Sequence, residues 1–259
     1  MNFLKLFNLP INASSHGHEV DMVIYLIHIL MVILFVGWGI YFVVAILKFR
    51  KKKNQKANYR GVTSHYTTWI EIGVVVFEAI LLLGFSIPFW AKQVNAFPKR
   101  KDVINVRIVA EQFAWNVHYP GPDGIFGKAD IKFFDKQSNP LALDPNDPNS
   151  KDDITTINQL HLPIGKPAII ELTSKDVIHS FSLPVMRVKQ DVIPGMSIPT
   201  WFTPTKTGQF EIACAQLCGI GHYRMKGYMT IHTQEDYDLW LAEQKASAED
   251  SEQYDDFWN

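Results

Sequence analysis

The chain has 259 residues, of which 47% are hydrophobic and 20% are charged, with a formal net charge of −1 at pH 7. This balance gives no reason to expect a nucleic-acid partner, which selects strongly basic surfaces. The two cysteines leave room for one disulfide at most. The charge is unevenly distributed, because acidic residues gather after Gln234.

Two apolar segments in the first third of the chain predict a membrane anchor. After an extramembrane N-terminal segment, 1–21, whose apolar run is too short for a convincing signal peptide, residues 22–47 carry no charge. At roughly 1.5 Å per residue, this segment can cross a hydrocarbon core of about 30 Å. Residues 67–91 form a similar second span. The sequence therefore predicts a transmembrane helical hairpin with both chain ends on one side.

The connecting segment, 48–66, sets the expected orientation. It is rich in lysine and arginine and holds no acidic residue, which is typical of a loop retained in the cytoplasm. Lys92 and the basic residues 99–101 weaken this asymmetry without reversing it. We expect a multi-pass protein of a bacterial inner (plasma) membrane, in contact with lipid, with its C-terminal domain facing the periplasm.

The second span contains two carboxylates, Glu71 and Glu78. Ionisable groups inside a membrane are costly and usually face protein or water, so each is a functional hypothesis. The two lie seven residues apart and therefore on nearly the same helical face. For Glu78 an interhelical hydrogen bond is the favoured role, and His28 in the first span is also interpreted as structural.

Beyond Lys92 the pattern changes to short β-like runs separated by Pro, Gly, Asn and Asp. Such spacing predicts a Greek-key sandwich or barrel over residues 92–234. Residues 120–153 are too rich in turn formers for a central strand and are interpreted as an inserted loop with solvated turns. Residues 235–259 predict a helix followed by an acidic tail.

The run C-A-Q-L-C-G-I-G-H-Y-R-M, from Cys214 to Met225, is the most specific motif. Thiolates, imidazole and a thioether together select copper, whereas structural zinc sites use cysteine and histidine alone. A disulfide between Cys214 and Cys218 is the alternative. A mononuclear blue-copper site uses one cysteine, so the second cysteine suggests two copper ions bridged by both thiolates. Such a pair needs another histidine, which His179 in D-V-I-H-S-F can supply.

These residues resemble the copper-bearing subunit II of cytochrome c oxidase, in which H-S is followed by C-x3-C-x3-H-x2-M. The resemblance extends from the first apolar segment to roughly Trp240 and implies a cupredoxin-like domain with a dinuclear copper centre, CuA. It implies that one copper takes His179, Cys214, Cys218 and Met225, and that the other takes both thiolates, His222 and the backbone carbonyl of Gln216.

The resemblance also assigns roles outside the copper loop. The family's aromatic strand Q-W-x-W matches Q-F-A-W, so Phe113 and Trp115 become the expected electron path. Glu71 is expected at the mouth of a proton channel. Gln216 stands where many members have a glutamate that binds magnesium at the boundary with subunit I, and an amide is a weaker ligand than a carboxylate. Another departure is Pro194–Met196, where arginine commonly follows the glycine.

By this resemblance the chain is the electron-entry subunit of a respiratory haem-copper oxidase. It accepts electrons from cytochrome c or another c-type haem protein and passes them to haem in subunit I. By the same resemblance, that partner holds the haems, reduces oxygen to water and pumps protons, with subunit III in the same complex. A fused haem c domain, found in some relatives, is not expected here, because no C-x-x-C-H motif occurs. The alternatives are the CuA subunit of a nitric oxide reductase, a membrane-tethered copper-binding protein, and a structural subunit with a disulfide.

The β-rich region is not acidic on net, although an acidic face in the family steers basic cytochrome c. Four acidic residues remain candidates for a local patch: Glu111, Asp176, Asp191 and Glu211.

Overall fold

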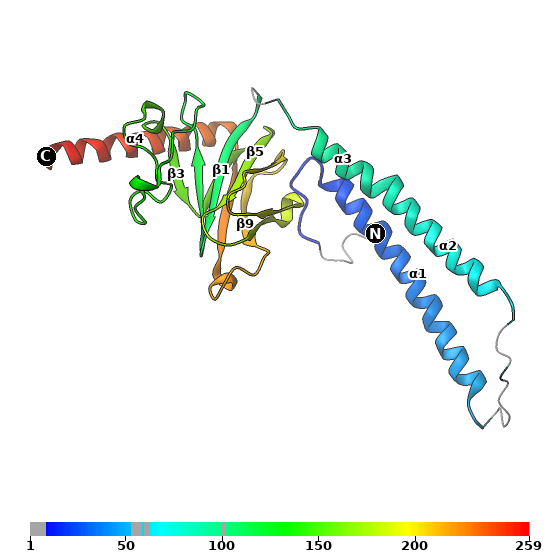
Figure 1. Cartoon of the computed structure of the whole chain (residues 1–259). Helices are drawn as coiled ribbons and strands as arrows, with labels where there is room; N and C mark the ends of the chain where they lie inside the picture. The colour runs from blue at the N-terminus through cyan, green and yellow to red at the C-terminus, as the bar shows by residue number, and fades with distance from the viewer. Residues whose placement is uncertain (1–8, 53–58, 60–62, 100–101, 259) are drawn as a thin grey trace. The chain divides into compact units, whose positions relative to one another are not determined.

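The computed structural model describes residues 9–52, 59, 63–99 and 102–258. Lys53, Lys56 and Arg60 of the basic loop, Arg100 and Lys101 after the second span, and residues 1–8 lie outside the described part. The chain divides into two compact units (Figure 1). One is built from His18–Ala96, and the other from Phe97 onward together with a short segment that ends at Gly17.

The first unit consists of two long apolar helices. α1 spans Gly17–Phe49, and a second helix of 30 residues spans Tyr66–Asn95. At roughly 1.5 Å per residue, both exceed the length needed to cross a hydrocarbon core of about 30 Å. Both helices extend beyond the predicted spans, and Lys92 forms an ion pair with Glu19 across them. The described residues therefore form an antiparallel helical pair.

The second helix is interrupted in its middle. α2 (Tyr66–Leu81) and α3 (Ile87–Asn95) are joined by a π turn, η2 (Leu82–Ser86). Pro88, near the start of α3, has no backbone N–H to donate, and helices commonly adjust just before such a residue. The hydroxyl of Ser86 donates to the carbonyl of Leu81 at 3.3 Å, which satisfies one acceptor within the turn.

The second unit is a sandwich of two five-stranded sheets. One has the order β3-β2-β1-β5-β8, with β1 (Ile104–Glu111) parallel to β5. The other has the order β4-β10-β9-β6-β7, with β4 parallel to β10. The bounds of the remaining strands are β2 Ala114–Tyr119, β3 Ile154–Ile157, β4 Gln159–Pro163, β5 Ala168–Ser174, β6 His179–Leu183, β7 Val188–Val192, β8 Ile198–Phe202, β9 Gly208–Cys214 and β10 Lys226–His232.

The core lies between the two sheets and follows the two-residue period of each strand. In β1 the side chains of Val106, Ile108 and Ala110 are buried in alternation with partly exposed neighbours. Phe181 and Leu183 project into the same core from β6. Two apolar helices followed by an all-β, cupredoxin-like domain are the fold class that the sequence predicts, and that prediction is confirmed.

The inserted loop, 120–153, folds mainly through carboxylates that accept backbone N–H groups. It includes two short 3-10 helices, η4 (Ile131–Phe133) and η5 (Pro148–Ser150), each preceded by an aspartate. Asp153 accepts from Gly127 N at 2.8 Å and pairs with the buried His118 of β2 at 2.6 Å. These contacts anchor the insertion to the sandwich.

Residues 9–16, which we call the N-terminal strap, form part of the sandwich unit. Ala13 is completely buried in the core and exchanges hydrogen bonds with Val185 and Thr205, both at 2.8 Å. Ser14 donates its hydroxyl to the carbonyl of Met186 at 2.8 Å. From sequence, these residues are predicted to form an N-terminal segment separate from the domain that begins at Lys92. The structure instead places the strap in the sandwich unit.

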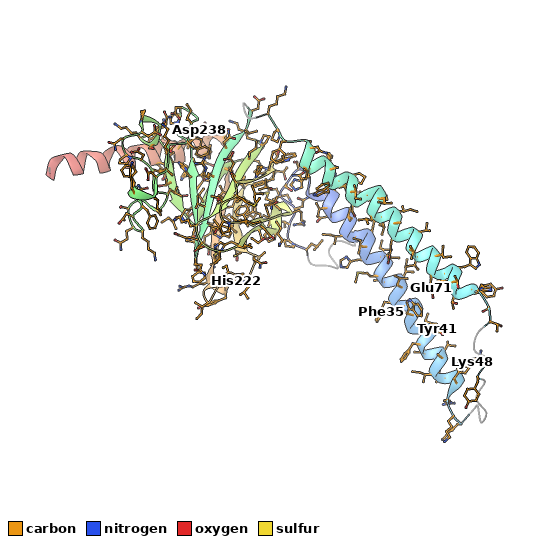
Figure 2. The ribbon with its side chains drawn as sticks, in the orientation of Figure 1. Phe35, Tyr41, Lys48, Glu71, His222 and Asp238 are labelled. Carbon is orange, nitrogen blue, oxygen red and sulfur yellow. The ribbon has the colours of Figure 1, made fainter. Side chains whose placement is uncertain are left out.

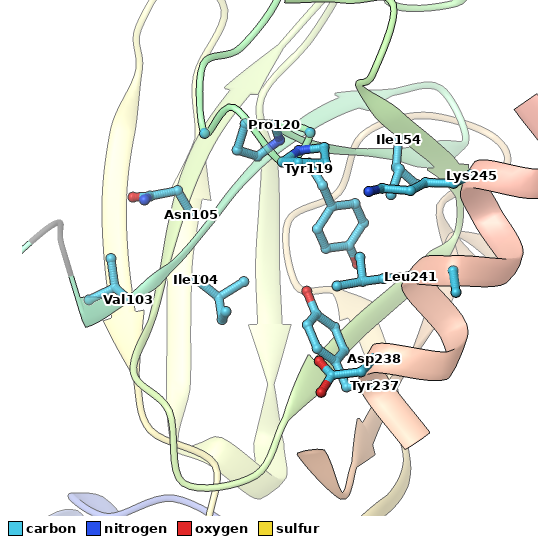
Figure 3. A pocket seen from close by; sticks show the side chains of 14 residues that line it. Val103, Ile104, Asn105, Tyr119, Pro120, Ile154, Tyr237, Asp238, Leu241 and Lys245 are labelled. Atoms are coloured by element: carbon cyan, nitrogen blue, oxygen red, sulfur yellow. The ribbon is translucent and has the colours of Figure 1, made fainter. Parts of the chain in front are cut away.

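Helix α4 (Gln234–Trp258) follows β10 and contacts β4 and β10. Tyr237 and Trp240 bury their rings against the sheets. Between α4, Tyr119 and Ile154 lies a mainly apolar groove of about 480 Å³ (Figure 3). The helix continues to Trp258 through the stretch predicted to be an acidic tail.

Candidate metal centre

Two connections at one end of the sandwich bring the predicted ligands together. β6 begins at His179, and β9 ends at Cys214, after which residues 215–225 form the loop that leads into β10. β6 and β9 pair antiparallel, with Phe181 opposite Cys214. The backbone N–H of Ala215 donates to Ser180 at 2.9 Å, which fixes the base of the loop beside His179. Figure 2 shows His222 at the tip of this loop.

The sulfur atoms form the centre of the cluster. The two Sγ atoms of Cys214 and Cys218 lie 3.9 Å apart, and both thiols are free. Cys214 Sγ lies 4.0 Å from His179 Nδ1 and 3.2 Å from the carbonyl oxygen of Gln216. Cys218 Sγ lies 3.6 Å from His222 Nδ1 and 3.7 Å from Met225 Sδ. The other four predicted donors therefore converge on the pair of Sγ atoms.

The two thiols differ in their affinity for protons. Burial opposes ionisation of Cys214, but its contacts with His179 and with neighbouring backbone groups lower its pKa to about 6. Burial, reinforced by the adjacent Cys214, raises the pKa of Cys218 to about 11. A metal that binds both thiolates must therefore displace a proton from Cys218, because only deprotonated thiols are ligands.

The donor set fits copper. His179 is completely buried, Cys218 and Met225 are nearly so, and His222 is half-buried. Two thiols, two imidazoles and a thioether form a soft set that suits copper better than zinc or magnesium. The sulfur separation is too long for a disulfide bond, which requires about 2.05 Å, so the geometry is that of a dithiol.

Trp115 lies beneath the cluster. Its ring is fully buried, with its centroid 6.2 Å from the ring of His179 and 5.5 Å from that of Phe181, both in edge-on arrangements. Its indole N–H has no hydrogen-bond partner among the described residues. Trp115 is thus both a core residue and a direct neighbour of a predicted ligand.

Phe113 covers the loop from the other side. A Cβ atom on Gly221 would lie 2.4 Å from the Phe113 ring, and one on Gly219 would lie 3.3 Å from it. Only residues without side chains allow this approach, and Gly219 also has a φ of +137°. Arg224 lies over the same ring, 5.7 Å from its centroid. Both aromatic residues of the predicted electron path therefore lie within the metal site.

Two polar residues at the site were not predicted as part of it. Asp176 accepts a hydrogen bond from His179 Nε2 at 2.9 Å, and Gln112 donates its side-chain amide to the carbonyl of Cys218 at 2.6 Å. Asp176 stands three residues before His179, which is the one sequence signal for its role. Nothing in the sequence indicates that Gln112 contacts Cys218.

Three of the four acidic residues that are candidates for a local patch are engaged by neighbours. Lys175 pairs with Glu111 at 2.8 Å, and Lys189 with Asp191 at 3.2 Å. Asp176 is engaged by His179. The exposed rim of the metal loop is apolar instead, since Leu217, Ile220 and Tyr223 are 76%, 95% and 87% exposed.

The remaining predicted site residues lie elsewhere. Glu71 (Figure 2) and Glu78 are exposed on α2 in the helical unit. Gln216 has an exposed side chain. Among the described residues, His179, Cys214 and Cys218 make up the one group of three or more His, Cys, Asp or Glu side chains close enough to share a metal. No cluster of carboxylates accompanies Gln216 there, so its magnesium role stays a prediction.

Comparison with known proteins finds relatives of one family. Residues 104–233 match the family model described as cytochrome c oxidase subunit II, periplasmic domain. The chain is 34% identical over 218 residues to the alternative cytochrome c oxidase subunit 2 of Bradyrhizobium diazoefficiens, covering 84% of this chain and 75% of that protein.

Two further matches cover smaller parts of the chain. Cytochrome c oxidase subunit 2 of Thermostichus vulcanus is 43% identical over 90 residues, covering 35% of this chain and 27% of that protein. The crystal structure of the periplasmic domain of subunit II of cytochrome oxidase from Bradyrhizobium japonicum is 29% identical, with a TM-score of 0.42. The match covers 58% of this chain and 97% of that one.

Proposed function

Because the chain belongs to the cytochrome c oxidase subunit II family, we propose that it is the electron-entry subunit of a respiratory haem-copper oxidase, carrying a dinuclear CuA centre. The observation that supports this most directly is the convergence of four other donor groups on two thiols 3.9 Å apart. Oxygen reduction and its coupled proton pumping then belong to subunit I, which holds the haems.

Of the six groups that would hold the two coppers, two would be shared by both ions and four would each belong to one ion. Cys214 and Cys218 would be ligands of both coppers, His179 and Met225 would be ligands of one, and His222 and the carbonyl of Gln216 would be ligands of the other. When bound, copper would supply a one-electron couple spread over two ions. The protein contributes ligands that are largely buried from water, with His179 and the loop base held by hydrogen bonds. A held geometry changes little between oxidation states, which favours fast electron transfer.

Entry and exit of electrons require contacts with two partners. Phe113, lying against the metal loop, is suited to the entry side, where cytochrome c or another c-type haem protein would dock. The exposed apolar rim of Leu217, Ile220 and Tyr223 is suited to a protein interface. We assign this rim to subunit I, which receives the electrons, with subunit III elsewhere in the complex.

The membrane arrangement follows from chain connectivity. His16 precedes α1 and Phe97 follows α3, and both rings lie near Trp201, at 6.4 and 6.3 Å between centroids. The chain therefore leaves the sandwich unit before α1 and returns to it after α3 at neighbouring positions. With two spans, the loop between them would lie on the opposite side of the membrane from the sandwich, and its basic residues favour the cytoplasm. We infer two spans in a bacterial inner membrane, with the sandwich in the periplasm and Glu71 toward the cytoplasmic end as a proton-channel entry.

Copper content and the electron paramagnetic resonance spectrum of the full chain in detergent test this function. We expect two coppers per chain, with one unpaired electron shared equally between them in the oxidised form. Cys218→Ser should abolish the shared signal. One copper per chain, with a spectrum localised on a single ion, would instead favour a tethered copper-binding protein. Co-purification with a catalytic subunit that consumes nitric oxide rather than oxygen would favour a nitric oxide reductase.

A further inference from the structure

Gln112 joins the two chain segments that carry the ligands. His179 begins β6, whereas Cys218 belongs to the loop after β9. Gln112, in the connection between β1 and β2, lies between these segments. Its backbone N–H donates to Asp176 Oδ2 at 2.8 Å, and its side-chain amide donates to the carbonyl of Cys218 at 2.6 Å.

Asp176 connects the backbone of Gln112 to the predicted ligand His179. Its Oδ1 atom accepts from His179 Nε2 at 2.9 Å and from Val177 N at 2.7 Å. The opposite ring nitrogen, Nδ1, is the one that faces Cys214. A hydrogen bond to the distal nitrogen fixes the orientation of a ligating imidazole. The backbone of Gln112 therefore helps to hold the carboxylate that orients His179.

The side chain of Gln112 acts on the second segment. A carbonyl oxygen can only accept, so the amide nitrogen of Gln112 must face Cys218. A Cβ atom on Gly219 would lie 2.6 Å from that nitrogen, and Phe113 packs on Gly221 immediately beside it. The amide of Gln112 is thus enclosed between the metal loop and the β1–β2 connection, which limits its alternatives.

We propose that Gln112 is a positioning residue of the metal centre, which fixes Cys218 relative to His179 by bonding the Cys218 carbonyl and the Asp176 carboxylate together. This proposal rests on the proposed function, because the positioned groups are ligands only if copper binds. It also holds for the metal-free protein. There, the same bonds keep the two sulfur atoms at 3.9 Å and oppose their closure into a disulfide.

Two variants of the full chain in detergent test the proposal. Gln112→Met keeps the length of the side chain and removes its donor, and Gln112→Glu places an acceptor against the Cys218 carbonyl at neutral pH. Gln209→Met, at an exposed position of β9, is the matched control. In both test variants the backbone bond to Asp176 can remain, so the change is confined to the Cys218 contact.

The first measurement is metal-free. Oxidised glutathione takes two electrons from the dithiol, giving the Cys214–Cys218 disulfide and two reduced glutathione molecules, so the equilibrium constant is measurable. A hydrogen bond worth about 1 kcal/mol corresponds to a factor of roughly five. We expect Gln112→Met to shift the equilibrium toward the disulfide about 3- to 10-fold, and Gln209→Met to leave it unchanged. Equal constants in Gln112→Met and wild type would overturn the proposal.

The second measurement uses copper-loaded protein. Release of copper to a chelator should be about 3- to 10-fold faster in Gln112→Met, and faster still in Gln112→Glu, with an altered copper hyperfine pattern. A lower unfolding temperature with an unchanged spectrum and release rate would mean that Gln112 is merely structural, and would overturn the proposal. Failure of the wild type to take up two coppers would instead refute the proposed function, while the disulfide equilibrium would still decide the role of Gln112.

Discussion

The docking of helix α4 should depend on pH through His161. The ring of His161, on β4, stacks on Trp240 of α4 with centroids 4.4 Å apart and planes 6° apart. On its other side lies His232 of β10, whose Nε2 is 2.8 Å from His161 Nδ1. The two imidazoles share one proton, since one nitrogen must donate and the other accept. A further proton on the accepting nitrogen would break this bond.

The neighbouring groups do little to stabilise a positive charge. Burial, followed by repulsion from His232, lowers the pKa of His161 to about 4. Burial also lowers the pKa of His232, although Asp236 opposes the change. Tyr119 bonds only the backbone of His161, and burial raises the pKa of that phenol well above its usual value. The pair is therefore held neutral in the folded protein.

The sign and size of the effect follow from these values. An unfolded histidine has a pKa of about 6.5, so between about pH 6.5 and 4 the unfolded chain binds more protons than the folded one. Stability is present in full above about 6.5 and is lost as the pH falls toward 4. A shift of 2.5 pKa units is worth about 3 kcal/mol at most, and partial exposure of His161 reduces this to roughly 1–2 kcal/mol.

Unfolding of the full chain in detergent at pH 7.5 and 5.0, with amide hydrogen exchange in α4, measures the effect. His161→Phe keeps a ring against Trp240 but cannot titrate. Between pH 7.5 and 5.0 a little over half of the effect is lost, so this variant should lose about 1 kcal/mol less than the wild type on acidification. His65→Gln, at an exposed position before α2, should behave as wild type. An identical loss in His161→Phe and wild type would refute the assignment of the pH dependence to this ring.

Three further substitutions test other contacts. Ala13→Leu should lower the free energy of unfolding, measured in denaturant, by about 1–3 kcal/mol through overpacking. Ile11→Ala, on the exposed part of the strap, should change it by no more than about 0.5 kcal/mol. Equal effects of the two substitutions would contradict the burial of the strap. Trp115→Ala should cost roughly 3–5 kcal/mol, and an unchanged denaturation midpoint would show that its ring is not part of the core. Gly221→Ala should cost about 1–3 kcal/mol and weaken copper binding, since its methyl group would meet Phe113. Phe113→Ala should remove most of that penalty in a double-mutant cycle, and simple additivity would argue against the contact.

The ligand loop could be predicted because its chemistry is local. Cys214, Cys218, His222 and Met225 lie within twelve consecutive residues, and donors so close in a loop have few ways to avoid one another. His179 was predicted because a pair of coppers needs a second histidine, but its approach to the loop depends on the antiparallel pairing of β6 with β9, which the local sequence does not show. Hydrophobic periodicity likewise predicted the two apolar helices and the short strands, since length and alternation are properties of the sequence itself.

Tertiary structure decided the contacts that join distant segments. Ala13, a small residue in a polar stretch, has no sequence signal for complete burial, and it is buried because the strap pairs with residues nearly 200 positions away. The same holds for Gln112, which reaches Cys218 only because the sheets bring their loops to one end. The sequence by itself determined the membrane-type helices, the β-rich domain and the donor chemistry. The fold decided how the donors are held, because hydrogen bonds between distant segments depend on strand order and register, which local residue patterns do not encode.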